Sequence, residues 1–263
     1  MMIRSILNFA YLKGVSLLDT AEAYGDAQRI IGEYHKMNHQ KFNVITKFSP
    51  FRKDLSFDVI ERVNNNLTTL NINSLYSYMF HSYKDYKEYF PLFKNGLIKL
   101  QSQKKIIKIG VSLHLNDEIT EVLKNDDIGI IQLPFNLLDN SNKRKEILLE
   151  AKQKGVEIHT RSVFLQGLFF KDPNEISGDL LDIKEDLKML NSLVLKENIN
   201  DLAINYVYSK EYIDGILLGV DNIHQLKSNF DCLEFSKTKS LIAEIDKINI
   251  TNKSMLNPVN WNQ

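Results

Sequence analysis

The sequence is poor in the features that mark several common classes of protein. Only one of its 263 residues is a cysteine, Cys232, which excludes an internal disulfide and a metal site built from several cysteines. Its 33 basic and 33 acidic side chains cancel, so no global attraction to nucleic acid or to an anionic membrane is expected. Polar residues interrupt the N-terminal stretch MMIRSILNFAYLKG, and we therefore expect neither a signal peptide nor a membrane span there.

Internal boundaries are also absent from the sequence. No stretch rich in Pro, Gly or Ser divides the chain, and no short repeat is evident. Hydrophobic residues make up 43% of the chain and charged residues 25%, which is typical of a globular protein with a sizeable core. Because α/β barrels often occupy about 200–250 residues as one domain, we expect a single cytoplasmic domain over 1–263, in which 236–263 form a C-terminal helix and tail.

Short apolar segments alternate with stretches of helical periodicity. Strands are predicted at 15–20, 42–48, 75–81, 106–112, 128–134, 156–162 and 215–220. Helices are predicted from the apolar stripes within 3–11, 59–70 and 180–194, and over 146–154 and 222–230. This alternation predicts a parallel α/β fold, with 163–178 as the longest loop. Seven strands are one fewer than an eight-stranded barrel contains.

Polar side chains follow the predicted strands at their ends. The set is Asp19, Tyr24, Lys47, His81, Ser112, Gln132, Arg161 and Ser162. In parallel α/β proteins the carboxyl ends of strands converge on one mouth, where sites are built. Lys47, held by Asp19, would lower the pKa of Tyr24 from its usual value of about 10 and let the phenol donate a proton near neutral pH. A single charged residue at a strand end is more often a solvated strand end or an ion pair than a catalytic group, and only the coincidence of several such strand ends points to catalysis.

Longer motifs resemble those of one known family. The run GVSLLDTAEAYGDAQRIIGE, followed in order by VITKF, MFHS, KKIIKIGVS, IIQLPFNLLD, GVEIHTRSVFLQGL and NYVYSKEYIDGILLGVDNIHQLKSN, resembles the aldo-keto reductases over residues 1 to about 235. The resemblance implies a (β/α)8 TIM barrel of which seven strands are visible here and the first is missing. It also implies carbonyl reduction with a nicotinamide cofactor, usually NADPH, and no metal.

The resemblance assigns roles residue by residue. It implies that Tyr24 is the general acid, that Asp19 and Lys47 tune it, and that His81 orients and polarises the carbonyl group. The implied cofactor contacts are Ser112 and Gln132 for the carboxamide, Arg161 stacked on the nicotinamide, the backbone of Ser162 to Gly167 (with Gln166) for the pyrophosphate, and Gly219, Asp221, Gln225 and Asn229 for the adenosine half.

Two departures from the family pattern qualify this interpretation. Asp221 stands where many members contact the 2′-phosphate through Arg or Ser, which weakens the preference for NADP and allows NAD; alternatively, Asp221 caps the following helix. The family's N-terminal hairpin and first strand also have no counterpart. We therefore expect open strand edges at 15–20 and 215–220, self-association and weak activity of the chain by itself.

Two functions from different classes remain open at this point. The first is an oxidoreductase that reduces a small aldehyde or ketone, with no nucleic acid or membrane partner. The second is a non-catalytic relative that binds cofactor weakly and acts through interactions. A phosphate-binding barrel isomerase is disfavoured, because LLGVDN is a poor glycine-rich phosphate loop.

Overall fold

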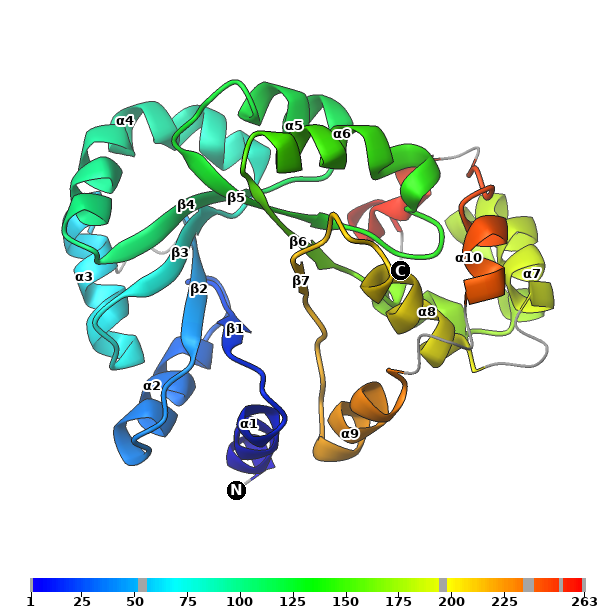
Figure 1. Ribbon diagram of the computed structural model, residues 1–263, viewed down its shortest axis with the longest axis horizontal. Helices are drawn as coiled ribbons and strands as arrows, with labels where there is room; N and C mark the ends of the chain where they lie inside the picture. The colour runs from blue at the N-terminus through cyan, green and yellow to red at the C-terminus, as the bar shows by residue number, and fades with distance from the viewer. Residues whose placement is uncertain (1, 52–55, 194–197, 234–238, 251–252, 262–263) are drawn as a thin grey trace. The chain divides into compact units, whose positions relative to one another are not determined.

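A computed structural model describes residues 2–51, 56–193, 198–233, 239–250 and 253–261. The chain divides into two compact units, Met1–Gln132 and Leu133–Gln263. Each unit is an alternation of strands and helices (Figure 1).

The first unit is a parallel sheet with helices between successive strands. In chain order it contains α1 (Met2–Leu12), β1 (Leu17–Asp19), α2 (Ala27–Met37), β2 (Asn43–Phe48), α3 (Val59–Leu70), β3 (Leu75–Phe80), α4 (Tyr83–Ser102), β4 (Ile106–Ser112), α5 (Asn116–Val122) and most of β5 (Ile128–Pro134). Each strand from β1 to β5 pairs in parallel with the next one along the chain. This is the order that right-handed βαβ units produce.

The register of these strands places polar residues above an apolar core on one face. Ile45, Met79 and Ile130 are fully buried in contact with one another. Lys47 and Gln132 each lie two residues further along their strands, so they share that face, because strand side chains alternate. Asp19 is paired in register with Ile45 and Ser112 with Gln132. The predicted site residues of this unit therefore stand at the carboxyl ends of the strands on one face.

The opposite face of the sheet packs against helices. Helix α4 packs on β3 and β4 (Figure 1), where Phe48 and Phe80 meet Phe93 at ring-centroid distances of 5.2 and 6.5 Å. Helices α2 and α3 also approach closely, since any Cβ at Gly32 would lie 1.8 Å from the carbonyl oxygen of Thr69. The glycine in the motif IIGE is thus required by helix packing.

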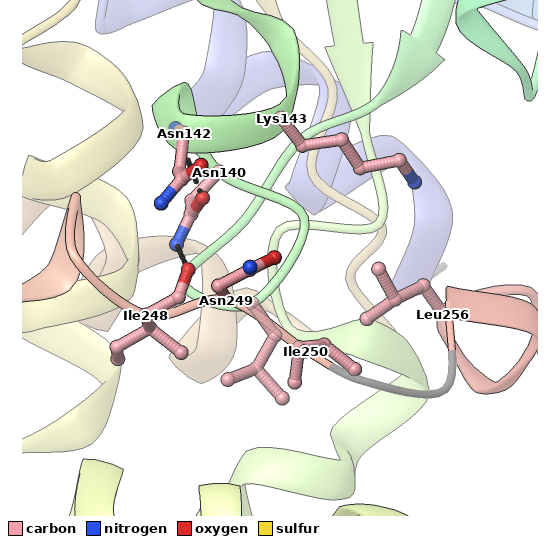
Figure 2. Close-up of a pocket in the computed structure, with 8 residues that line it drawn as sticks. Asn140, Asn142, Lys143, Ile248, Asn249, Ile250 and Leu256 are labelled. Atoms are coloured by element: carbon pink, nitrogen blue, oxygen red, sulfur yellow. Dashed lines mark hydrogen bonds between the residues drawn. The ribbon is translucent and has the colours of Figure 1, made fainter.

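The second unit contains shorter strands and more irregular structure. Its elements are α6 (Ser141–Gln153), β6 (Glu157–Arg161), α7 (Lys184–Leu193), α8 (Ile199–Tyr208), β7 (Gly215–Ile216), α9 (Ile223–Asp231), α10 (Lys239–Ile245) and the 3₁₀ segments Leu165–Phe170, Pro173–Glu175, Gly178–Ile183, Lys253–Leu256 and Pro258–Asn260. Strands β6 and β7 are parallel neighbours. The Asn140 side chain donates to the carbonyl oxygens of Ile245 and Ile248 at 2.8 and 3.0 Å, beside a small pocket that reaches Leu256 (Figure 2).

Most predicted elements are confirmed, and five differ in extent. All seven predicted strands are present in the described residues, but the first spans only Leu17–Asp19 rather than 15–20, and the last pairs only over Gly215–Ile216 rather than 215–220. The helix predicted at 146–154 begins at Ser141, and the loop 163–178 contains 3₁₀ segments. The stripe predicted over 180–194 is divided between a 3₁₀ segment and α7, and its last residue lies outside the described residues. Among the described helices, none combines the length and apolarity needed to cross a membrane.

Candidate active site

The carboxylate of Asp19 binds two of the predicted site residues. The Lys47 Nζ atom lies 2.5 Å from Asp19 Oδ2, and Gln132 Nε2 donates to Asp19 Oδ1 at 2.9 Å. Lys47 is 1% exposed and also donates to the carbonyl oxygen of Thr20 at 3.3 Å. A buried ammonium group is costly unless it is paired and hydrogen-bonded, so Asp19 both neutralises and orients Lys47.

Tyr24 lies against this ion pair. Its ring centroid is 5.5 Å from Lys47 Nζ and 5.6 Å from the His81 ring, whose plane is inclined at 77°. Tyr24 is 47% exposed, which leaves the side chain accessible to a small molecule. The structure therefore brings Asp19, Tyr24, Lys47 and His81 together, as the strand-end pattern predicted.

Ser112 and Gln132 lie side by side on the same face. They are in register on β4 and β5, and both are buried. The backbone N–H of Leu113 donates to the carbonyl oxygen of Gln132 at 2.7 Å, which extends the pairing past Ser112. The Gln132 amide is thus both a partner of Asp19 and a neighbour of Ser112.

The turn after β6 has an unusual backbone conformation. Ser162, Leu165 and Gln166 have φ values of 60°, 46° and 51°, and Gly167 has a φ of 81°. Left-handed conformations cost about 1–2 kcal/mol in residues other than glycine, and such strain concentrates at ligand-binding segments. The Arg161 guanidinium, before the turn, donates to the hydroxyl of Ser162 at 3.4 Å. The strained turn coincides with the segment expected to line a pyrophosphate.

The segment after β7 corrects one alternative interpretation. Helix α9 is capped by Asn222, whose side chain accepts hydrogen bonds from the backbone of His224 and Gln225 at 2.9 and 3.0 Å. Asp221 therefore does not cap this helix; it is exposed, and its backbone N–H donates to Gln225 Oε1 at 2.7 Å. Asn222 takes the capping position because the helix begins one residue later than an Asp221 cap requires.

The cofactor residues of the second unit follow two neighbouring strands. Since β6 and β7 are parallel, the turn at 162–167 and the segment at 219–229 begin at the same edge of this strand pair. A Cβ at Gly167 or Gly219 would meet nothing within 4 Å, so backbone is accessible at both positions. Asn229, in contrast, is buried in α9. A strained, accessible turn beside polar side chains fits a dinucleotide.

Sequence reasoning missed one buried polar group next to the site. Glu22 lies between Asp19 and Tyr24 in the sequence, is 1% exposed, and pairs with Arg62 Nη2 at 2.7 Å. The sequence of α3 does contain a pattern that indicates a buried partner such as Glu22. Arg62 and Asn66 stand four residues apart among the apolar residues of the predicted stripe, which indicates a buried polar partner.

Comparisons with known proteins agree with this geometry. Two solved structures of the aldo-keto reductase AKR11C1 from Bacillus halodurans are similar to the chain, the holo form at 20% identity with a TM-score of 0.78 and the apo form at 23% with 0.72. Each comparison covers 95% of this chain and 88% of the other, which confirms the barrel fold class. No curated protein sequence matches. The model of the Aldo/keto reductase family matches residues 3–250, and the chain therefore belongs to this family of nicotinamide-dependent oxidoreductases that act on carbonyl compounds.

Proposed function

We propose that this protein reduces an aldehyde or ketone with NAD(P)H, and that Tyr24 donates the proton. The observation that carries the proposal is the contact of the Tyr24 ring with both Lys47 and His81, while Lys47 is held by Asp19. A half-exposed phenol beside a buried cation is suited to giving up a proton to a bound molecule.

Different residues of the first unit have different roles in proton transfer. When bound, the reduced nicotinamide supplies the hydride for the carbonyl carbon. Tyr24 gives its phenolic proton to the carbonyl oxygen, and the ammonium of Lys47 stabilises the phenolate that is left. Asp19 pairs with that ammonium in its buried position, which offsets the cost of burying the charge.

His81 and the amide of Gln132 would position the reactants. His81 lies edge-on to Tyr24 and would hydrogen-bond the carbonyl oxygen, which orients the substrate for attack. Ser112 and Gln132 would hold the carboxamide of the nicotinamide ring. Because Gln132 also donates to Asp19, it links the cofactor position to the ion pair.

The second unit would hold the rest of the cofactor. Arg161 would stack on the nicotinamide, the backbone of 162–167 would line the pyrophosphate, and Gly219, Gln225 and Asn229 would close on the adenosine half. Asp221 does not cap α9 and is exposed, so its carboxylate would be accessible to a bound ribose. A carboxylate accepts a hydrogen bond from a 2′-hydroxyl and repels a 2′-phosphate, so we propose weak discrimination between NADPH and NADH.

A matched pair of tyrosine variants tests the proposal. Oxidation of NADPH and NADH is followed in the presence of a panel of small aldehydes and ketones. Tyr24→Phe should lower kcat by about 10²–10⁴-fold with an unchanged cofactor Kd, whereas the exposed Tyr208→Phe should match the wild type. A Tyr24→Phe enzyme that keeps most of its turnover would rule out Tyr24 as the proton donor.

One observation favours an interaction role beside this activity. Strand β1 pairs with β2 on one side, and no other strand among the described residues of the first unit pairs with its opposite edge. Unpaired edges promote association. Self-association and a cytoplasmic location stay predictions; a monomeric mass at micromolar concentration in light scattering would contradict the first of them.

A further inference from the structure

The carboxylate of Glu22 is the most extensively hydrogen-bonded group beside the site. Its Oε1 atom accepts from Asn66 Nδ2 at 2.8 Å and from the Tyr78 hydroxyl at 2.9 Å. Its Oε2 atom accepts from the backbone N–H of Ser49 at 2.9 Å and from Arg62 Nε and Nη2 at 2.9 and 2.7 Å. A side chain that accepts this many hydrogen bonds holds its own backbone firmly in place.

These donors all lie outside the turn that carries Tyr24. Ser49 follows β2, Tyr78 is on β3, and Arg62 and Asn66 are on α3. The backbone of Glu22 adds a further tie, since its N–H donates to the carbonyl oxygen of Lys47 at 3.1 Å. Residue 22 is therefore bound to the peptide of the very lysine that Tyr24 must face.

The network keeps its charges balanced in the interior. The Arg62 guanidinium also donates to the carbonyl oxygens of Ser49 and Ser56, and it lies 4.6 Å from the centroid of the Phe48 ring. Burial raises the pKa of Tyr78 well above its usual range, so its hydroxyl stays protonated and donates to Glu22. Buried polar networks of this kind stabilise one defined geometry when every member is satisfied.

Tyr24, two residues further on, is held differently. It is 47% exposed, so packing encloses only part of its side chain. Its backbone N–H donates to the carbonyl oxygen of Ala21 at 3.0 Å, within the same short turn. The position of the Tyr24 ring relative to Lys47 thus depends on how the backbone of residues 21–24 is held. In that segment, Glu22 makes the hydrogen bonds to the surrounding elements and is the anchor of the turn.

We propose that Glu22 is a positioning residue, whose buried carboxylate fixes the turn at 20–26 so that the Tyr24 phenol stays beside Lys47. This inference rests on the proposed function, because it assigns the purpose of the anchor to the proton donor. Among the described residues of the first unit, Lys47 and His81 are charged or titratable groups that face Tyr24, and Asp19 lies behind Lys47. Loosening the anchor should move the ring away from the ammonium, and the phenol should then ionise at a higher pH.

Two variants loosen the anchor without touching a catalytic residue. Glu22→Gln keeps the side-chain length but removes the charge that Arg62 and Ser49 bind, and Tyr78→Phe removes one hydrogen bond while conserving the ring. We expect kcat to fall by about 10- to 100-fold in Glu22→Gln and by a smaller factor in Tyr78→Phe. KM should stay within about twofold, and the alkaline limb of the kcat–pH profile should move upward in both variants.

A measurement independent of turnover separates this proposal from the proposed function. Tyrosines labelled with ¹³C at Cζ are titrated by NMR, with the Tyr24 signal assigned by its loss in Tyr24→Phe. Both variants should raise the pH at which this signal titrates. Asp139→Asn serves as the control: it disrupts the buried Asp139–Arg144 pair of the second unit and should lower Tm without shifting the Tyr24 signal.

The outcomes are distinct. An unchanged Tyr24 titration and an unchanged kcat in folded Tyr78→Phe would overturn the positioning role, and this variant decides the question if Glu22→Gln does not fold. A Tyr24 shift equal in Asp139→Asn and Tyr78→Phe would also overturn it, because the effect would then be general destabilisation. If the wild type reduces no carbonyl compound, the proposed function fails, while the titration still decides whether Glu22 positions Tyr24.

Discussion

The two units present their site residues in contrasting ways. In the first unit, side chains hold one another: Asp19 binds Lys47 and Gln132, and Lys47 lies beside Tyr24. In the second unit, the expected cofactor segment is defined by backbone, with left-handed residues at 162 and 165–167. Proton transfer needs particular atoms at fixed positions, whereas a long, polar dinucleotide is held by a backbone that can approach it closely.

The contrast extends to the way each region tolerates change. The side-chain cluster is buried around Lys47, so the loss of one member leaves a charge without its partner. The strained turn is more exposed, and its conformational cost is offset only when a ligand or the surrounding structure favours it. Substitutions in the first unit should therefore affect the chemical step, and those in the second should affect cofactor affinity.

Among the substitutions that compare the two units, we expect the largest effect in the side-chain cluster. Lys47→Met removes the ammonium beside Tyr24 and leaves Asp19 without its cation, so kcat should fall by about 10²–10³-fold. Cofactor Kd, measured by fluorescence titration, should change little. The exposed Lys124, which pairs with Glu121 on the surface, provides the control variant Lys124→Met. A similar loss of kcat in Lys47→Met and Lys124→Met would contradict the assigned role of Lys47.

The next largest effect is expected from a substitution in the turn at 162–167. Gly167→Ala places a Cβ on a residue with a φ of 81°, which costs about 1–2 kcal/mol and should weaken NADPH binding by about 5- to 30-fold. The value of kcat at saturating cofactor should stay the same. Gly155→Ala introduces comparable strain at a φ of 75° in another turn. If Gly155→Ala weakens cofactor binding equally, the 162–167 turn has no special part in it.

A smaller effect concerns cofactor choice. Asp221→Arg replaces a carboxylate that repels a 2′-phosphate by a cation that binds it, so the ratio of the Kd values for NADH and NADPH should rise by about tenfold. Asp231→Arg makes the same charge change at the other end of α9 and should leave the ratio unchanged. A wild type that already prefers NADPH strongly would show that other groups bind the phosphate.

The smallest effect is on the pH dependence of stability. Burial lowers the pKa of His35 from 6.5, and its neutral ring is bound on both sides, since Nδ1 contacts the carbonyl oxygen of Leu70 and Nε2 accepts from the N–H of Phe42. The unfolded chain takes up the proton first as pH falls, so this stabilisation is complete above about pH 6.5 and is lost below it.

A series of Tm values from pH 7.5 to 5.5 measures the slope in this window. His35→Gln should flatten the acid slope, and the exposed His224→Gln should leave it as in the wild type. Equal slopes in wild type and His35→Gln would mean that other groups set the acid sensitivity of the protein.

Much of the fold could be predicted because the signals are local. The stripe of Val59, Val63, Leu67 and Leu70 has the period of a helix, and α3 covers the same residues. The apolar run at 128–134 has the length and composition of a buried strand, as observed for β5. The length of the strand predicted at 215–220 was less predictable, because a segment forms a strand only where a neighbouring strand pairs with it. Strand β6 ends at Arg161, and Ser162 has a φ of 60°, so in the described part of this unit the last backbone contact with β6 is the hydrogen bond from Leu217 N–H to the carbonyl oxygen of Thr160.

The sequence by itself determined the alternation of strands and helices, the strand ends at which Asp19, Lys47, His81 and Gln132 stand, and the family whose motifs they match. These depend on periodicity and on the order of residues along the chain. Only the tertiary structure decided that Asn222 rather than Asp221 caps α9, and that Glu22 is enclosed by Ser49, Arg62, Asn66 and Tyr78. Capping depends on where a helix begins in space, and a buried carboxylate depends on donors that the chain brings together from 27, 40, 44 and 56 residues away.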